Sequence, residues 1–247
     1  MNIKQYLDST YLKTAAQAGL SEQDNTTVVK KFVQEAIDEG FKLIMIRPDK
    51  VKMAREMIVA AKSKVLIGTV ISFPEGTNST SEKLEEAQKA IEEDADEIDF
   101  VCNYEAFKKG ELELVKKEIY LGTQLAFEHH KVAKWIIEVA ALTDAQIIRF
   151  AALIKNTIIS NFKEDCYPNV FVKSSTGFFK TENNKPNGAT FPAIIMILEN
   201  ASPLPVKAAG GVRTYDEALQ MIRLGVKRIG TSSAKTIANG EIATGNY

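Results

Sequence analysis

Short runs of β-branched, aromatic and other apolar residues recur along the chain, and longer amphipathic stretches separate them. A short apolar run of this kind is consistent with a buried strand. Strands that alternate with helices predict a parallel sheet covered by helices. The runs that we interpret as strands are Leu7–Leu12, Phe41–Ile46, Val65–Ser72, Glu97–Asn103, Lys134–Ala140, Asn169–Ser175, Leu204–Ala209 and Lys227–Thr231.

The intervening stretches carry helical signals. Leu84, Ala87 and Ile91 recur near helical spacing, with glutamates and lysines between them. The capping-box pattern, a hydroxyl followed three residues later by Glu or Gln, begins two of the stretches, at Thr143 and Thr214. The clearest predicted helices are Thr26–Glu39, Ser81–Glu93, Asp144–Asn156 and Tyr215–Leu224.

About eight strand–helix units in 247 residues predict one (β/α)₈ barrel, the TIM-barrel fold. A doubly wound open sheet is the alternative, but it normally uses fewer strands. No Gly-x-Gly-x-x-Gly follows the first strand, and there is no Walker lysine motif. Since no linker composition interrupts the pattern, residues 1–247 are predicted to form a single domain. Its polar end, from about residue 235 to 247, is expected to be a flexible tail.

Composition narrows the function classes. The formal net charge of −1 gives no bulk electrostatic reason to expect nucleic acid or an anionic membrane as a partner. No apolar run approaches the ~20 residues of a membrane span, and the N-terminus lacks the apolar region of a signal peptide. We therefore expect a cytoplasmic protein whose two cysteines, Cys102 and Cys166, are reduced.

Two lysines and one aspartate occupy unusual places in the predicted strands. Lys173 and Lys207 lie near the ends of apolar runs, although lysine is almost never buried unless paired. Asp99 lies between large apolar residues. A structural Asp–Lys ion pair would explain the position of one lysine but not that of the second. Burial and a neighbouring cation both lower a lysine pKa and free the amine as a nucleophile, so the pattern predicts imine chemistry.

Two glycine-rich segments follow the last two predicted strands. One contains Gly210 and Gly211, and the other contains Gly230, Ser232 and Ser233. Glycine lets backbone N–H groups approach a ligand, and barrels often bind phosphate at these strand ends. The alternative is two helix-entry turns without a ligand. Together the segments favour a phosphate site.

Metal chemistry has little support in the sequence. The two histidines, His129 and His130, are adjacent, so on a helix they lie about 100° apart and cannot chelate like an i, i+4 pair. Neither cysteine has a metal-ligand partner at suitable spacing. We expect no metal and no cofactor, and the lack of metal ligands favours imine chemistry at a lysine.

Several motifs together resemble those of the deoxyribose-phosphate aldolase family. They occur in family order, and the two that contain the lysines are specific to that family, whereas the glycine segments are generic to phosphate-binding barrels. The matching segments are Asp8–Lys13, Glu97–Asn103, Phe171–Phe178, Val206–Arg213 and Gly230–Ser233.

The resemblance implies a class I aldolase that reversibly cleaves 2-deoxy-D-ribose 5-phosphate to D-glyceraldehyde 3-phosphate and acetaldehyde. By the family pattern Lys173 forms the imine, Lys207 lowers its pKa, and Asp99 works with Lys207 and a water in proton transfer. The partners would be a phosphorylated sugar and an aldehyde, with a possible homodimer. The residues expected to bind substrate or phosphate, or to line the barrel mouth, are Asp8, Thr10, Thr176, Gly177, Gly210, Gly211, Gly230, Ser232 and Ser233.

The chain departs from the family at two positions. Met45 replaces a cysteine of some members, and Phe178 replaces a lysine, which shifts phosphate binding toward backbone N–H groups. Tyr247 is a hypothetical lid over the barrel mouth. Glu138 is either a site residue or a partner for a barrel lysine, and we favour the second. The rival functions are another lysine-dependent phosphosugar aldolase and a non-catalytic sugar-phosphate-binding barrel.

Overall fold

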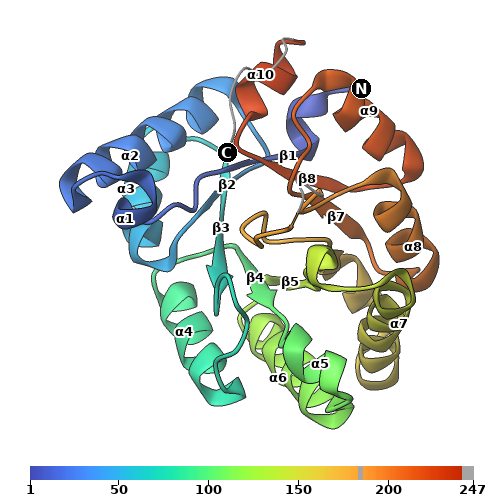
Figure 1. The fold of residues 1–247 in the computed structure, drawn as a ribbon. Coiled ribbons are helices and arrows are strands. Elements are labelled where there is room, and N and C mark those ends of the chain that lie inside the picture. The colour runs from blue at the N-terminus through green and yellow to red at the C-terminus, as the bar shows by residue number, and fades with distance from the viewer. Residues whose placement is uncertain (183–185, 241–247) are drawn as a thin grey trace.

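The computed structural model describes residues 1–182 and 186–240. Within these ranges, eight parallel strands close into a barrel in which each strand pairs with its neighbours in chain order. Figure 1 looks down the barrel axis, with the strands at the centre. The strands are β1 (Leu7–Thr10), β2 (Leu43–Ile46), β3 (Leu66–Ile71), β4 (Glu97–Val101), β5 (Val132–Ile136), β6 (Val170–Lys173), β7 (Val206–Ala209) and β8 (Arg228–Thr231).

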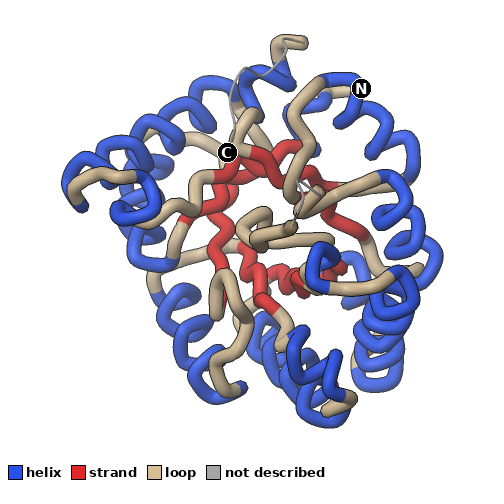
Figure 2. Tube along the Cα trace, viewed as in Figure 1, coloured by secondary structure: helices blue, strands red, loops and turns tan. Residues whose placement is uncertain are grey.

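Helices form a ring around the strands (Figure 2). The α-helices are α1 (Ala15–Ala18), α2 (Glu22–Glu39), α3 (Val51–Ala60), α4 (Thr80–Glu92), α5 (Tyr104–Lys109), α6 (Leu112–Glu128), α7 (Asp144–Asn161), α8 (Phe191–Ala201), α9 (Tyr215–Leu224) and α10 (Ala234–Ala238). Short 3₁₀ helices are η1 (Ile3–Tyr6), η2 (Pro48–Lys50), η3 (Val139–Ala141) and η4 (Glu164–Asn169).

The predicted barrel is confirmed, and every predicted strand overlaps an observed one. Both capping boxes form, at Thr143 and Thr214. The largest difference concerns β5, which begins at Val132 and ends at Ile136, whereas the predicted strand is Lys134–Ala140. Glu138 has a φ of 56°, in the left-handed region, so its backbone cannot continue an extended strand.

The layer between barrel and helices is apolar and closely packed. Trp135 of β5 stacks on Phe100 of β4 with ring centroids 4.7 Å apart. Its indole N–H donates to Thr123 Oγ1 of α6 at 3.0 Å, so the one polar atom of the ring is satisfied. Gly122 of α6 lies against the same ring. The absence of a side chain there lets α6 approach the sheet.

A buried ion pair holds the carboxyl end of β4. Lys83 Nζ of α4 lies 2.5 Å from Glu118 Oε2 of α6 and donates to the carbonyl of Val101 at 2.8 Å. Glu118 Oε1 also accepts the N–H of Asn103 at 3.0 Å. Two helices therefore fix the backbone just beyond Asp99. Breaking such a buried pair leaves an uncompensated charge, so it constrains this strand end strongly.

The C-terminal segment is helical at its start. Residues 234–238, which include the beginning of the expected tail, form α10, and Tyr247 lies outside the described residues. In the described ranges, no helix is long and apolar enough to cross a membrane. Cys102 and Cys166 are free thiols.

We expect Gly122→Ala to destabilise the protein, because its Cβ would lie 2.7 Å from Trp135 Cη2. Overpacking costs about 1–3 kcal/mol, more than the roughly 1 kcal/mol gained in helix propensity. Urea unfolding followed by circular dichroism measures the change. In a Trp135→Phe background the clash is relieved, and Gly122→Ala should cost less; equal costs in both backgrounds would refute this packing argument.

Candidate active site

Six charged side chains form a closed ring of ion pairs inside the barrel, in which acids and bases alternate. Successive members are 2.5–2.9 Å apart. All six residues are buried. We call this set the charge ring; in order around it, the members are Asp99, Lys134, Glu97, Arg228, Asp8 and Lys207.

Strand geometry explains how the ring assembles. Side chains on a strand alternate between faces, so Glu97 and Asp99 of β4 point to the same side. Register places Lys134 beside Asp99, and Arg228 beside Lys207. Each carboxylate thus lies between two cations, which compensates the cost of removing these charges from water.

Lys173 is a seventh charge attached to the ring. Its Nζ lies 2.8 Å from Asp99 Oδ2, an oxygen that also accepts Lys207 Nζ at 2.9 Å. The ring has three carboxylates and three cations, so its formal charge is already zero. Lys173 is 3% exposed and lines the pocket described below. When Lys173 loses its proton, the charge ring and Lys173 together carry no net charge.

The pKa shifts follow this arrangement. Burial, followed by the neighbouring cation Lys207, lowers the pKa of Lys173 to about 8, against the opposing effect of Asp99. Burial by itself would raise the pKa of Asp99, but three lysines outweigh it and hold that pKa well below its usual range. Burial would lower the pKa of Lys134, yet Asp99 and Glu97 raise it. The site thus combines a stable carboxylate with one amine that readily becomes neutral.

The opposite side of the barrel interior is apolar. Leu12, Leu43, Met45 and Val70 form a separate buried cluster. Phe178 packs at the edge of this cluster and makes an edge-to-face contact with Phe73 at 5.0 Å. Both departures from the family pattern, Met45 and Phe178, therefore contribute apolar surface on this side.

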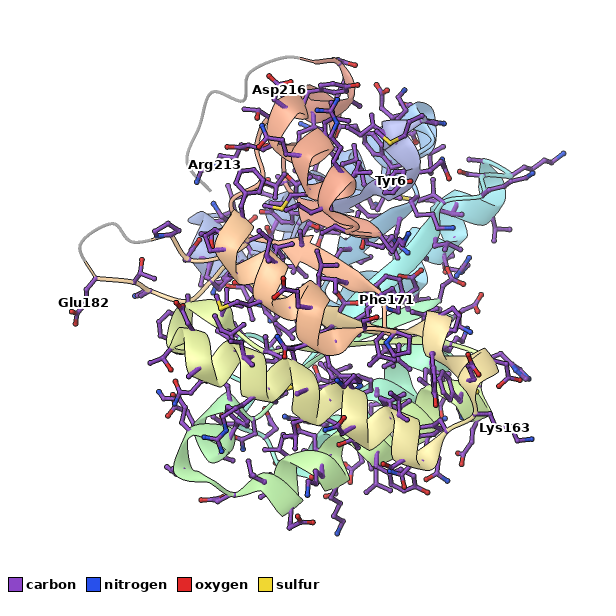
Figure 3. All side chains as sticks on the ribbon, turned by 90° about the vertical axis from the view of Figure 1, so that its right-hand side faces the viewer. Tyr6, Lys163, Phe171, Glu182, Arg213 and Asp216 are labelled. Carbon is purple, nitrogen blue, oxygen red and sulfur yellow. The ribbon has the colours of Figure 1, made fainter. Side chains whose placement is uncertain are left out.

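A pocket opens above Lys173 at the carboxyl ends of the strands. In Figure 3, which views the barrel from the side, Arg213 and Glu182 lie at the left, beyond β7 and β6, while Phe171 and Lys163 lie to the right. The pocket is on the side of Arg213. Its lining comprises Thr10, Leu12, Lys173, Thr176, Gly177, Asn187, Ala209, Gly210, Gly211, Val212, Arg213, Gly230, Thr231 and Ser232.

Backbone rather than side chains forms one wall of this pocket. Gly210 and Gly211 have φ values of 84° and 88°, which side-chain-bearing residues rarely adopt. Gly210 is also in tight contact with Gly188, where an added Cβ would lie 2.4 Å from the Gly210 carbonyl oxygen. Arg213 adds a cation that the motif analysis did not select. This wall can bind an anion through N–H groups and one guanidinium.

The structure places most of the predicted site residues together. Lys173, Lys207 and Asp99 are in direct contact, and the predicted glycines, Thr10, Thr176 and Ser232 line the pocket. Two placements differ from expectation. Asp8 is fully buried in the charge ring and does not line the mouth. Ser233 lies outside the lining, with its N–H donated to Thr231 Oγ1 at 3.0 Å.

The expectation for Glu138 is wrong. Its carboxyl group makes no ion pair with a barrel lysine among the described residues; it contacts Ser175 and Thr176 in the loop after β6. Sequence reasoning also missed the ring members Glu97, Lys134 and Arg228. A signal existed for Glu97, two residues before Asp99 and hence on the same strand face.

Comparison with known proteins gives a consistent result, although no protein-family model matches the chain. Deoxyribose-phosphate aldolase of Thermococcus gammatolerans is 37% identical over 241 residues, which cover 97% of this chain and 96% of the relative. The same enzyme of Streptococcus gordonii is 36% identical over 248 residues and 100% of both chains. Among solved structures, the aldolase QR15 superposes with a TM-score of 0.80 at 30% identity, covering 97% of this chain and 95% of the other. A tetrameric deoxyribose phosphate aldolase from Aeropyrum pernix gives 0.76 at 26% identity, with 96% and 89% covered.

We expect the reactivity of Lys173 to rise with pH around a midpoint near 8, because its pKa is lowered to about 8. At pH 7 roughly a tenth of the amine would be neutral, about 300-fold more than for an ordinary lysine. Reductive methylation at a series of pH values, read by peptide mass spectrometry, measures this profile. The exposed Lys227 provides an internal reference.

Lys207→Met should move the Lys173 midpoint to higher pH. The substitution removes a cation that lowers the pKa of Lys173 and leaves Asp99 to act on it more strongly. An unchanged midpoint in this variant would show that Lys207 does not set the protonation of Lys173.

Proposed function

The chain belongs to the deoxyribose-phosphate aldolase family, and from this membership we propose that it cleaves 2-deoxy-D-ribose 5-phosphate through an imine on Lys173. As a member of the family it is an aldolase, a carbon–carbon lyase. The observation that carries the proposal is the position of Lys173, a fourth cation on a neutral charge ring and facing the pocket. The products are D-glyceraldehyde 3-phosphate and acetaldehyde.

In the proposed reaction the neutral amine of Lys173 adds to the aldehyde carbon of the open-chain sugar. Loss of water gives a protonated imine, which accepts the electron pair when the C2–C3 bond breaks. Removal of the C3 hydroxyl proton releases glyceraldehyde 3-phosphate and leaves an enamine on the lysine. Protonation of the enamine at C2 and hydrolysis of the imine then release acetaldehyde and restore the amine.

Lys207, held in place by Asp99, is the protein group that we propose for proton transfer. Their side chains are within 2.9 Å of each other, and Asp99 is also within 2.8 Å of Lys173. The strongly lowered pKa of Asp99 makes it a poor proton carrier by itself. We therefore assign the transfer to Lys207 and a water, with Asp99 holding both amines in place.

The phosphate group is proposed to occupy the wall that contains Gly210, Gly211 and Ser232. Phosphate bound there, away from the reacting carbons, would position the aldehyde over Lys173. Because Phe178 supplies no charge, Arg213 is the proposed counter-charge. This assignment favours a phosphorylated sugar and fits a role in deoxyribose phosphate catabolism.

Assembly and location stay predictions. The relative from Aeropyrum pernix is tetrameric, and a homodimer is what the sequence analysis suggests for this chain. We propose a homo-oligomer, whose size sedimentation velocity would measure. We also propose a cytoplasmic location, as the sequence led us to expect.

Incubation with deoxyribose 5-phosphate followed by borohydride reduction should leave an adduct on Lys173, identified by peptide mass. Lys173→Ala should lose turnover by roughly 10⁴-fold or more, as removal of a covalent nucleophile does, and show no adduct. Lys227→Ala, which removes an exposed lysine immediately before β8, is the matched control. An adduct elsewhere in the wild-type protein would sink the assignment.

Arg213→Met should raise KM for deoxyribose 5-phosphate by about 10- to 100-fold, the range expected for a charge-assisted hydrogen bond. Activity on unphosphorylated deoxyribose should change little, since that substrate carries no anion. Arg223→Met on α9 is the control for loss of a surface arginine. Equal losses on both substrates would contradict a phosphate role.

A further inference from the structure

Glu138 contacts one segment that borders the pocket and reaches a second through Ser175, and these contacts determine where its proton must be. It is buried at the carboxyl end of β5. Oε1 lies 2.7 Å from Ser175 Oγ. Oε2 accepts the backbone N–H of Thr176 at 3.0 Å and the hydroxyl of Thr176. Thr176 and Asn187 both line the pocket.

Ser175 has more acceptors around it than protons. Its Oγ lies 2.7 Å from Glu138 Oε1 and also 2.7 Å from the carbonyl oxygen of Asn187. A serine hydroxyl carries one proton, and a carbonyl carries none. If Glu138 were ionised, one of these two short oxygen–oxygen contacts would have no proton in it and would be repulsive.

A proton on Glu138 Oε1 satisfies every group. Glu138 then donates to Ser175 Oγ, and Ser175 donates to the carbonyl of Asn187. The second lone pair of Ser175 Oγ accepts the N–H of Gly177 at 2.9 Å. Each buried donor has one acceptor, as buried polar groups require.

We propose that Glu138 is a neutral carboxylic acid at neutral pH and a positioning residue for the aldolase site. Its proton fixes the direction of the Ser175 hydroxyl, which then donates to the carbonyl of Asn187, and its contacts hold the loop after β6 against the end of β5. The effect on turnover rests on the proposed function, whereas the protonation state does not.

The surrounding groups agree with a neutral acid. Burial raises the pKa of Glu138, although hydrogen bonds from Thr176 and Ser175 and the charge of Lys173 act in the opposite direction. Tyr104 of α5 is a further titratable group near Glu138, and burial raises the pKa of Tyr104. A second carboxylate beside Lys173 would favour its protonated form, and a proton on Glu138 avoids this.

Glu138→Gln tests the proposal, because the amide group can donate to Ser175 while its oxygen still accepts Thr176. We expect kcat/KM of Glu138→Gln to stay within about 3-fold of wild type at pH 7. Glu138→Ala should lose 10-fold or more, chiefly through KM, because Ser175 and Thr176 lose the contacts that hold the loop after β6 to the end of β5. If Glu138→Gln is as defective as Glu138→Ala, the neutral acid is refuted.

Two readouts are independent of catalysis. The infrared spectrum of the unliganded protein at neutral pH should contain a protonated-carboxyl band that Glu138→Gln removes. A raised pKa in the folded state means that the unfolded chain releases this proton first. Wild-type stability should therefore fall relative to Glu138→Gln as pH rises above about 4.5.

These readouts separate the two proposals. A carboxyl band in a protein without aldolase activity would refute the function and support the state of Glu138. The opposite outcome is full activity without this band and a difference in Tm between wild type and Glu138→Gln that is constant across pH. It would refute the neutral state of Glu138 and leave the proposed function intact. Circular dichroism of both variants shows whether a loss of activity reflects unfolding.

Discussion

Charge compensation inside the barrel is the constraint on which the site depends. Ionised groups removed from water are stable only beside opposite charges, and the charge ring meets this condition for six side chains within 2.5–2.9 Å. Because the closed ring is already neutral, it contains no excess negative charge to compensate a proton on Lys173. Reactivity at Lys173 is therefore a property of the whole interior rather than of one residue.

The rest of the fold holds this arrangement in place. Lys83 and Glu118 fix the strand end beyond Asp99 from outside the barrel. The apolar cluster of Leu12, Leu43, Met45 and Val70 fills the other side of the interior. A water-filled space there would weaken every ion pair by raising the local dielectric. Packing and electrostatics thus act on the same amine.

The sequence predicted the barrel and the three central residues of the site because both depend on local signals. Lys173, Lys207 and Asp99 stand out as charges inside apolar runs. The remaining ring members do not, since they become partners only through register between strands distant in the chain. Arg228 and Asp8 are 220 positions apart. Glu138 was misassigned because its left-handed backbone turns the carboxyl group toward the next loop. No sequence pattern encodes that turn for a non-glycine residue.

Closure of the ring also limits how this interior can change over evolutionary time. Each member has two partners, so neutralising one side chain leaves its two neighbours with one partner fewer and the ring with one uncompensated charge. A tolerated change at Arg228 would therefore call for a second change 131 or 220 positions away, at Glu97 or Asp8. Related sequences should accordingly vary at these positions in linked sets, and mutant libraries that sample them singly would miss the functional combinations.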